Sequence, residues 1–219
     1  MAWTAPSTFV AGAILTAAQL NTNVRDNSLA GGPIYTTETL RDAAITSPFE
    51  GQRAYITAPE AAKVTATGAT TAIPGGVASV YNGSVWVNTT PVGSTTAAAG
   101  TLGVSAYTST LAGTPGTNPS VTTYTGTTAM LFMSMVTLNS GTGATNQMDV
   151  LVTGATAGWV TGSFVASIQP GVAAVHTTVT MACVITGLTA GVNVFTLQYQ
   201  NNLGTATFLN RRLVVQGIA

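Results

Sequence analysis

The chain has 219 residues, of which 46 % are hydrophobic and 5 % charged, with a formal net charge of zero. A chain without net charge or basic clusters lacks the basic surface that attracts nucleic acids and anionic membranes. We therefore expect no nucleic-acid partner. The hydrophobic residues form patterned runs, which argues against disorder, and no run reaches the ~18 apolar residues that a membrane helix needs, so we expect no membrane insertion.

The charged side chains are distributed unevenly. Only Asp149, Arg211 and Arg212 lie after residue 63. A monomer with so few surface charges associates readily. Either a surface rich in threonine, serine and asparagine is hydrated without charge, or much of the surface is buried in a permanent assembly, and we favour the second hypothesis.

Residues 1–32 predict an anchoring segment, made of an extended stretch followed by a short helix. Thr16 and Gln19 form a capping box at the start of this helix. Its apolar stripe comprises Ala17, Leu20 and Val24. A helix of about 14 residues is marginal alone in water, so the stripe needs a partner, which is another part of the chain, a second copy or another protein. The N-terminus lacks the basic start and apolar run of a signal peptide.

Residues 33–92 predict a small α/β or β module. We expect one or two helical turns over residues 38–45, a turn at residues 48–51 and a strand over residues 52–57. Asn82 and Gly83 separate two apolar stretches and give the strongest local signal for a β-hairpin. Residues 93–101 are small and uncharged, which predicts a linker, either a swivel or a segment ordered where three chains meet.

Residues 102–219 predict an antiparallel β-sandwich of the jelly-roll type. About eight strands separated by glycine, proline and asparagine turns is the number that such a sandwich needs. The expected strands span residues 104–111, 121–124, 129–138, 147–153, 160–168, 175–185, 192–201 and 206–216. The predicted fold class of the whole chain is therefore mainly β.

The predicted strand over residues 129–138 is apolar on both faces. One face carries Met130, Phe132 and Val136, and the other carries Leu131, Met133 and Met135. Because a two-layer sandwich covers one face of each sheet, the second face needs a neighbouring subunit or a loop of the same chain. We predict that the second set, Leu131, Met133 and Met135, lies in a subunit interface.

The small number of histidine, cysteine and acidic residues argues against most catalytic and metal sites. The chain contains one histidine, His176, and one cysteine, Cys183, and Asp149 is the only acidic side chain after residue 60. A zinc site needs three or four ligands, and glycoside hydrolysis needs two carboxylates. We therefore expect no enzymatic activity, no metal and no cofactor.

Trp159 is the candidate for a ligand contact. It follows Gly158 in a predicted turn, where an exposed indole can stack on a sugar ring. The alternative is a tryptophan that caps the end of the sandwich core.

The N-terminal segment resembles the opening shared by many virion proteins of tailed bacteriophages. The similar stretches are WTAPSTFVAG and LTAAQLNTNVRDN. The candidate anchoring residues within them are Trp3, Pro6, Phe9, Val10, Leu20, Val24, Arg25 and Asp26. Ala13 departs from the pattern, where an acidic residue is common. The resemblance implies attachment to other virion proteins through this segment.

Two further stretches resemble parts of such proteins. SPFEGQRAYIT and VYNGSVWV are similar to a small module found after these anchors, and GLTAGVNVFTLQYQ and ATFLNRRLVVQGI resemble the last two strands of tumour-necrosis-factor-like (TNF-like) or head-fibre jelly rolls. Those domains are typically trimeric. The resemblance implies a homotrimeric virion component, assembled in the bacterial cytoplasm and attached as a tail fibre or minor tail protein. The alternatives are a capsid decoration or head-fibre protein and a receptor- or glycan-binding module that contacts the host cell surface.

Overall fold

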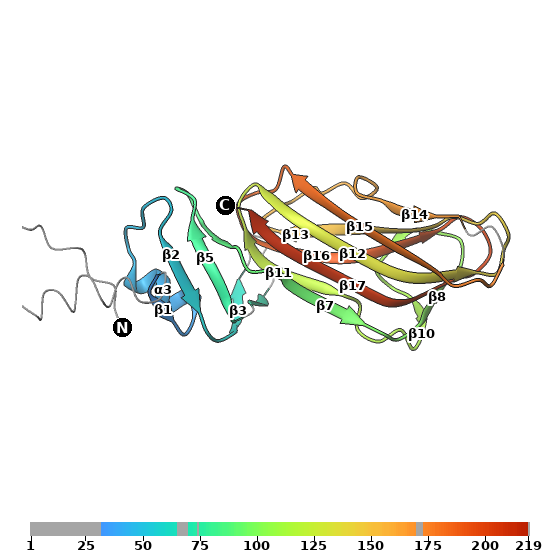
Figure 1. Cartoon of the computed structure of the whole chain (residues 1–219), viewed down its shortest axis with the longest axis horizontal. Coiled ribbons are helices and arrows are strands. Elements are labelled where there is room, and N and C mark those ends of the chain that lie inside the picture. Colours follow the sequence, from blue (N-terminus) through green and yellow to red (C-terminus); the bar gives the residue numbers. More distant parts are fainter. Residues whose placement is uncertain (1–31, 65–69, 74, 170–172, 219) are drawn as a thin grey trace, which may run out of the picture.

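The computed structural model describes residues 32–64, 70–73, 75–169 and 173–218. The predicted helix and all the candidate anchoring residues, from Trp3 to Asp26, lie outside the described residues. The described chain forms a small N-terminal module and a longer β-sandwich, placed end to end (Figure 1). Within the described part, no helix has the length and hydropathy to cross a membrane.

The small module is a four-stranded sheet with one helix against it (Figure 1). Its elements are β1 (Ile34–Tyr35), α3 (Glu38–Ala44), β2 (Arg53–Ile56), β5 (Val77–Tyr81) and β6 (Trp86–Asn88), in the sheet order β1-β2-β5-β6. A separate hairpin pairs β3 (Glu60–Val64) with β4 (Thr70–Ile73). Thr37 caps α3 by accepting a hydrogen bond from the Leu40 N–H at 3.3 Å. The helical turns predicted over residues 38–45 are present as α3.

The predicted hairpin at Asn82 and Gly83 is also confirmed. Gly83 adopts a φ of +92°, which favours glycine. The Asn82 carboxamide oxygen accepts hydrogen bonds from the N–H groups of Ser84 and Val85 at 3.1 and 3.0 Å. Because the turn uses these two amides, β6 begins only at Trp86.

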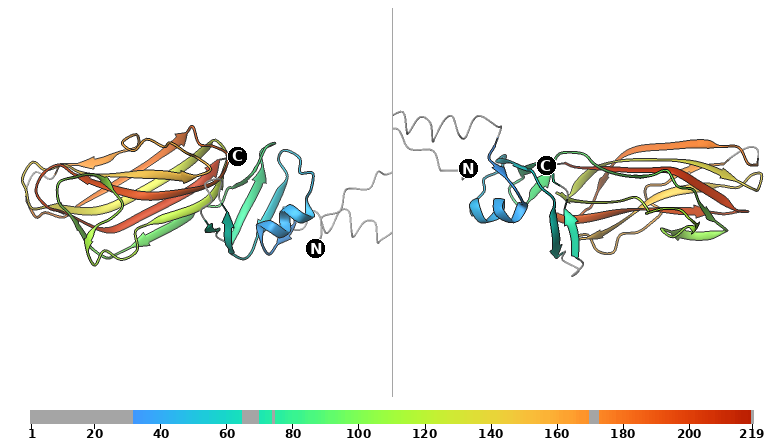
Figure 2. Two further views of the ribbon diagram at one scale, coloured as in Figure 1. Left: turned by 180° about the vertical axis from the view of Figure 1, so that it is seen from behind. Right: turned by 90° about the horizontal axis from the view of Figure 1, so that it is seen from below.

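The sandwich consists of two antiparallel sheets that lie face to face (Figures 1 and 2). The first sheet contains β7 (Val92–Thr96), β8 (Gly100–Leu102), β10 (Ala112–Gly113), β12 (Thr128–Asn139), β15 (Thr177–Thr186) and β17 (Ala206–Ile218). The second contains β9 (Ser105–Thr108), β11 (Ser120–Thr125), β13 (Asn146–Gly154), β14 (Ala166–Ile168) and β16 (Gly191–Asn201).

The strand order is that of a jelly roll. The first sheet runs β10-β8-β17-β12-β15, with β7 also on β17, and the second runs β11-β16-β13-β14, with β9 also on β16. From β11 onward the chain crosses repeatedly between the sheets, and this Greek-key winding is characteristic of jelly rolls. The predicted mainly β fold with an antiparallel jelly-roll sandwich is confirmed.

Strand β12 corrects the predicted subunit interface. Leu131, Met133 and Met135 are completely buried in the sandwich core of a single chain. They pack with Met148, Val150, Val152, Phe195, Leu197 and Tyr199 from the second sheet. The assignment of these three residues to an interface was wrong, because alternation separates two faces without showing which one meets the opposite sheet. The face that remains outside carries Met130 and Phe132.

Residues 93–101 are not a linker. Strand β7 pairs with Arg211–Val215 of β17, and β8 pairs with Ala206–Phe208 of the same strand. Small uncharged side chains do not prevent this, because sheet pairing uses main-chain groups. The sandwich therefore begins at Val92 instead of residue 102.

The module contacts the sandwich directly at the junction. The Gln216 side chain donates a hydrogen bond to the Thr89 carbonyl at 2.7 Å. Val87 is completely buried, and a methyl group added at Gly217 would lie 2.7 Å from its Cγ1 atom. The junction is therefore packed, which contradicts the swivel, one of the two alternatives for the predicted linker.

The predicted strand over residues 160–168 is mostly a loop. Only Ala166–Ile168 pair, as β14, with β13. Gly158 and Gly162 adopt φ angles of +70° and +95°, which interrupt an extended strand. The resulting loop, residues 155–165, contains Trp159.

A β-bulge in β17 reverses its side-chain alternation. Ser134 pairs with Arg212 and Val136 with Leu209, so two residues of β17, Asn210 and Arg211, share the position opposite Met135. Asn210 adopts a φ of +48° and is exposed, whereas Arg211 is completely buried.

Candidate functional site

An apolar patch covers part of the outer face of the first sheet. We call it the outer patch, and it comprises Met130, Phe132, Ala182, Val184 and Val214. The strand register places Met130 beside Val184, and Phe132 between Ala182 and Val214. Met130 and Val184 are 46 % and 54 % exposed. Contiguous exposed apolar surface of this kind marks interaction sites.

The surroundings of the outer patch carry little charge. Next along the strands, Ser134 pairs with Thr180 on one side and with Arg212 on the other. A hollow of about 200 Å³ in this face is lined by Pro91, Met130, Leu131, Phe132, Ala182, Val214 and Gln216. The outer patch therefore suits an apolar partner rather than a charged one.

Arg211 forms a buried polar cluster inside the sandwich. Its guanidinium donates to the Ala98 carbonyl at 3.3 Å, to the Pro115 carbonyl and to the Asn118 side-chain oxygen at 3.4 Å. The Tyr199 hydroxyl donates to the same Asn118 oxygen at 2.8 Å. The cluster ties the segments after β7 and β10 to the last strand, so its role is structural.

Tyr199 has an altered acidity in this cluster. Burial raises the pKa of its phenol to about 12, although the charge of Arg211 and a hydrogen bond from it act in the opposite direction. The guanidinium carbon lies 5.5 Å from the centre of the tyrosine ring. The folded chain therefore holds the neutral phenol more strongly than the unfolded chain does.

This difference predicts alkaline destabilisation. Below pH 10 both states keep the Tyr199 proton, so this group causes no pH dependence. Between pH 10 and about 12 the unfolded state releases the proton while the folded state retains it, so stability falls, by roughly 2–3 kcal/mol. Urea unfolding across this interval should show a smaller loss for Tyr199→Phe than for the unaltered chain. Equal losses would contradict the assignment.

Three buried asparagines join the two sheets at the end far from the module. Asn139 donates hydrogen bonds to the side-chain oxygens of Asn146 and Asn201 at 2.7 and 2.9 Å. Asn146 donates to the Thr137 hydroxyl at 2.8 Å, and Asn201 to the Gly204 carbonyl at 2.9 Å. Sequence reasoning missed this network, because asparagine near a strand end also signals a turn.

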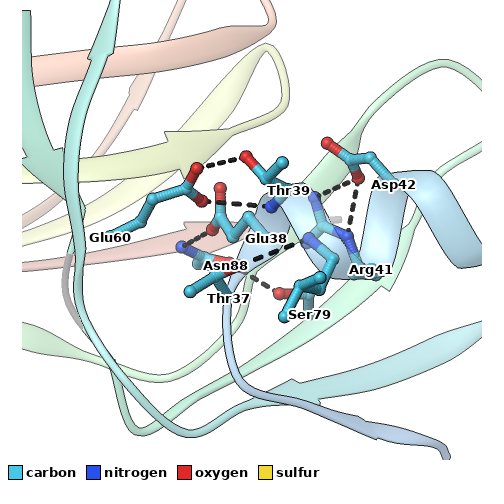
Figure 3. Close-up of polar contacts among 9 residues, drawn as sticks. Thr37, Glu38, Thr39, Arg41, Asp42, Glu60, Ser79 and Asn88 are labelled. Atoms are coloured by element: carbon cyan, nitrogen blue, oxygen red, sulfur yellow. Dashed lines mark hydrogen bonds and ion pairs between the residues drawn. The ribbon is translucent and has the colours of Figure 1, made fainter.

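The small module holds a polar cluster around α3 (Figure 3). The Ser79 hydroxyl donates to the Asn88 side-chain oxygen at 2.7 Å, and the Asn88 amide donates to Glu38 at 3.4 Å. The serine thus contacts an amide oxygen rather than a base, which is not the geometry of an activated nucleophile. The cluster joins the helix to β5 and β6.

Trp86 belongs to the core of the module. It is buried, and the Arg41 guanidinium carbon lies 4.6 Å from the centre of its ring. Arg41 also pairs with Asp42 at 2.8 Å. A tryptophan covered in this way is not placed to stack on a sugar.

Trp159, the candidate sugar contact, is half-buried at the edge of the sandwich. Its indole N–H donates to the Val150 carbonyl at 3.1 Å, and its ring stacks on Phe164 with centroids 5.8 Å apart. It packs against the core and also lines a surface cavity of about 350 Å³. The position of Trp159 is therefore compatible both with capping the core and with contacting a ligand.

The remaining reactive side chains do not form a metal-binding group in the described residues. In the described residues, no group of three or more histidine, cysteine or acidic side chains is placed to hold a metal ion. His176 is exposed, and Asp149 is completely buried and accepts a hydrogen bond from the Gly162 N–H. Cys183 is half-buried. Burial is the main cause that raises the pKa of its thiol, and the charge of Asp149 raises it further.

Comparisons with known proteins concern the fold. Neither the protein-family models nor the curated proteins give a match. Among solved structures, Eiger TNF from S. frugiperda is similar over 56 % of this chain and 92 % of that chain, at 13 % identity and a TM-score of 0.36. A chain of infectious bursal disease virus Gx strain is similar over 68 % of this chain and 44 % of that chain, at 13 % identity and a TM-score of 0.40. At these TM-scores the likenesses carry no argument about function.

Proposed function

We propose that the chain is a structural protein of a tailed-bacteriophage virion, attached through residues 1–32 and assembled as a homotrimer through its sandwich. The observation that carries the assembly is the outer patch, an apolar sheet face with Met130 and Val184 about half exposed. The virion assignment is supported by the resemblance of the N-terminal segment to phage virion proteins. A tail-associated fibre or minor tail protein is the leading form of this proposal.

The energetics of the outer patch favour an apolar subunit contact. Completing the burial of a large aliphatic or aromatic side chain contributes up to about 1.5–3 kcal/mol. Phe132, at the centre of the patch, and its cross-strand neighbour Val214 are both partly exposed in the single chain. A second copy packed on this face would bury several such side chains at once. Three copies are the assembly typical of the appendage domains that the last two strands resemble.

The distribution of charge supports the same proposal. Residues 102–219 contain three charged side chains, and two of them, Asp149 and Arg211, are completely buried. Over the described part of this domain, Arg212 is the only charged side chain at the surface. A surface with one charge per chain tolerates close packing of identical copies, because it brings few like charges together.

A capsid decoration or head-fibre protein is the second candidate, since it would use the same anchor and the same trimer. Electron cryomicroscopy of the virion distinguishes the two. Density for the chain at the tail would support the leading form, and density on the capsid surface would support the second.

Removal of residues 1–32 tests the attachment. We expect the truncated chain to remain a folded trimer, with three times the chain mass in light scattering, because the described residues form a packed unit. We expect it to be missing from particles produced by a phage genome that carries the truncated gene. Normal incorporation would contradict the anchoring role, and a stable monomer at micromolar concentration would contradict the trimer.

A further inference from the structure

A surface cavity lies between the loop of residues 155–165 and the end of β15. Its volume is about 350 Å³, within the range of about 300–1,000 Å³ that is usual for small-ligand sites. The lining includes Thr156, Trp159, Ser163, Phe164, Thr186 and Gly187. Every residue that lines the cavity is uncharged. Its chemistry is therefore aromatic and hydroxylic.

The aromatic wall of the cavity is held rigidly. Trp159 and Phe164 stack with an interplanar angle of 14°. The indole N–H is already bonded to the Val150 carbonyl at 3.1 Å, so the ring cannot rotate without breaking that bond. A ligand that packs on this wall therefore loses little affinity to side-chain ordering.

The loop that carries the wall is fixed at two further points. The Thr156 N–H donates to the side-chain oxygen of Asn193 at 2.9 Å, and Asn193 is completely buried. The Gly162 N–H donates to the carboxylate of Asp149, which is also completely buried. Two buried polar side chains therefore hold the loop that lines the cavity.

Hydroxyl groups in the lining retain capacity for a ligand. The Thr156 hydroxyl accepts a hydrogen bond from the Thr189 N–H at 2.9 Å, which leaves its own proton to donate. The Ser163 hydroxyl donates to the Val160 carbonyl at 3.0 Å, which leaves its lone pairs to accept. Gly158 and Gly187 also line the cavity, and neither has a side chain that would fill it.

We propose that this cavity binds a neutral sugar residue. The apolar C–H face of a pyranose would pack on Trp159, and its hydroxyls would bond to Thr156 and Ser163. A charged ligand would find no countercharge in the lining, and a purely apolar ligand would leave the remaining donor of Thr156 and the lone pairs of Ser163 unused. The site adds recognition of a glycan to the assembly role proposed above and depends on neither the anchor nor the trimer.

The test uses the full-length chain and free monosaccharides. Glucose, galactose, N-acetylglucosamine and rhamnose are tested separately by saturation-transfer NMR, with glucuronic acid as the charged comparison. We expect saturation of the ring C–H protons of at least one neutral sugar. No signal from any of the four neutral sugars, or a signal from glucuronic acid alone, would overturn the proposal.

Two matched variants locate the binding. Thr186→Arg places a long side chain in the lining of the cavity and should weaken binding at least tenfold. Thr142→Arg makes the same change at an exposed threonine beyond the other end of β12 and should leave binding unchanged. Both substitutions are at exposed positions, so melting curves should show that both variants fold. Unchanged binding in Thr186→Arg would place the sugar elsewhere and overturn the assignment.

Discussion

Replacing Phe195 with alanine is expected to lower the free energy of unfolding by about 3–5 kcal/mol per chain. Phe195 lies in the middle of β16, is completely buried and packs in the sandwich core. Its removal leaves a cavity that rigid neighbouring strands cannot fill. Urea denaturation followed by circular dichroism measures the loss.

Phe132 provides the matched comparison. The sequence pattern placed Phe132 on the face opposite the predicted subunit interface, but Phe132 lies on the outer patch and is partly exposed. Phe132→Arg should therefore leave the sandwich folded and convert the proposed trimer to a monomer, as seen in light scattering. Loss of folding in Phe132→Arg, or a loss below about 1 kcal/mol in Phe195→Ala, would contradict this division of the two faces.

Replacing Arg211 with methionine is expected to cost about 2 kcal/mol. Methionine occupies similar space, but it removes the donor of the Ala98 and Pro115 carbonyls, while the Asn118 oxygen keeps its hydrogen bond from the Tyr199 hydroxyl. A buried acceptor left unpaired costs about 1–3 kcal/mol. The β-bulge would still turn the side chain of residue 211 inward, but this side chain would no longer donate a hydrogen bond.

Arg212→Met is the control for this prediction. Arg212 is the next residue of the same strand and is exposed. Its replacement should change the free energy of unfolding by no more than about 0.5 kcal/mol. Thermal melts of the two variants under identical conditions give the comparison. Equal effects would show that the buried hydrogen bonds of Arg211 contribute little.

The candidate surfaces were only partly accessible to sequence reasoning. Trp159 was identified, because a tryptophan after a turn glycine is a recognisable signal. The cavity was not, because Thr186 and Gly187 come from a separate segment that only folding brings beside the loop of Trp159. Attachment through residues 1–32 stays a prediction, as does the trimer.

What the sequence determined by itself was the local periodicity. Alternation of apolar residues located most strands of the sandwich, and Asn82 with Gly83 located the hairpin, because these signals act between near neighbours. The tertiary structure decided which face of β12 turns inward, since both faces are apolar and only the opposite sheet distinguishes them. It also decided that residues 93–101 pair with β17, because main-chain hydrogen bonds do not depend on side-chain type. The bulge at Asn210 and Arg211 likewise depends on the register with β12, which is a contact between segments about 75 residues apart in sequence.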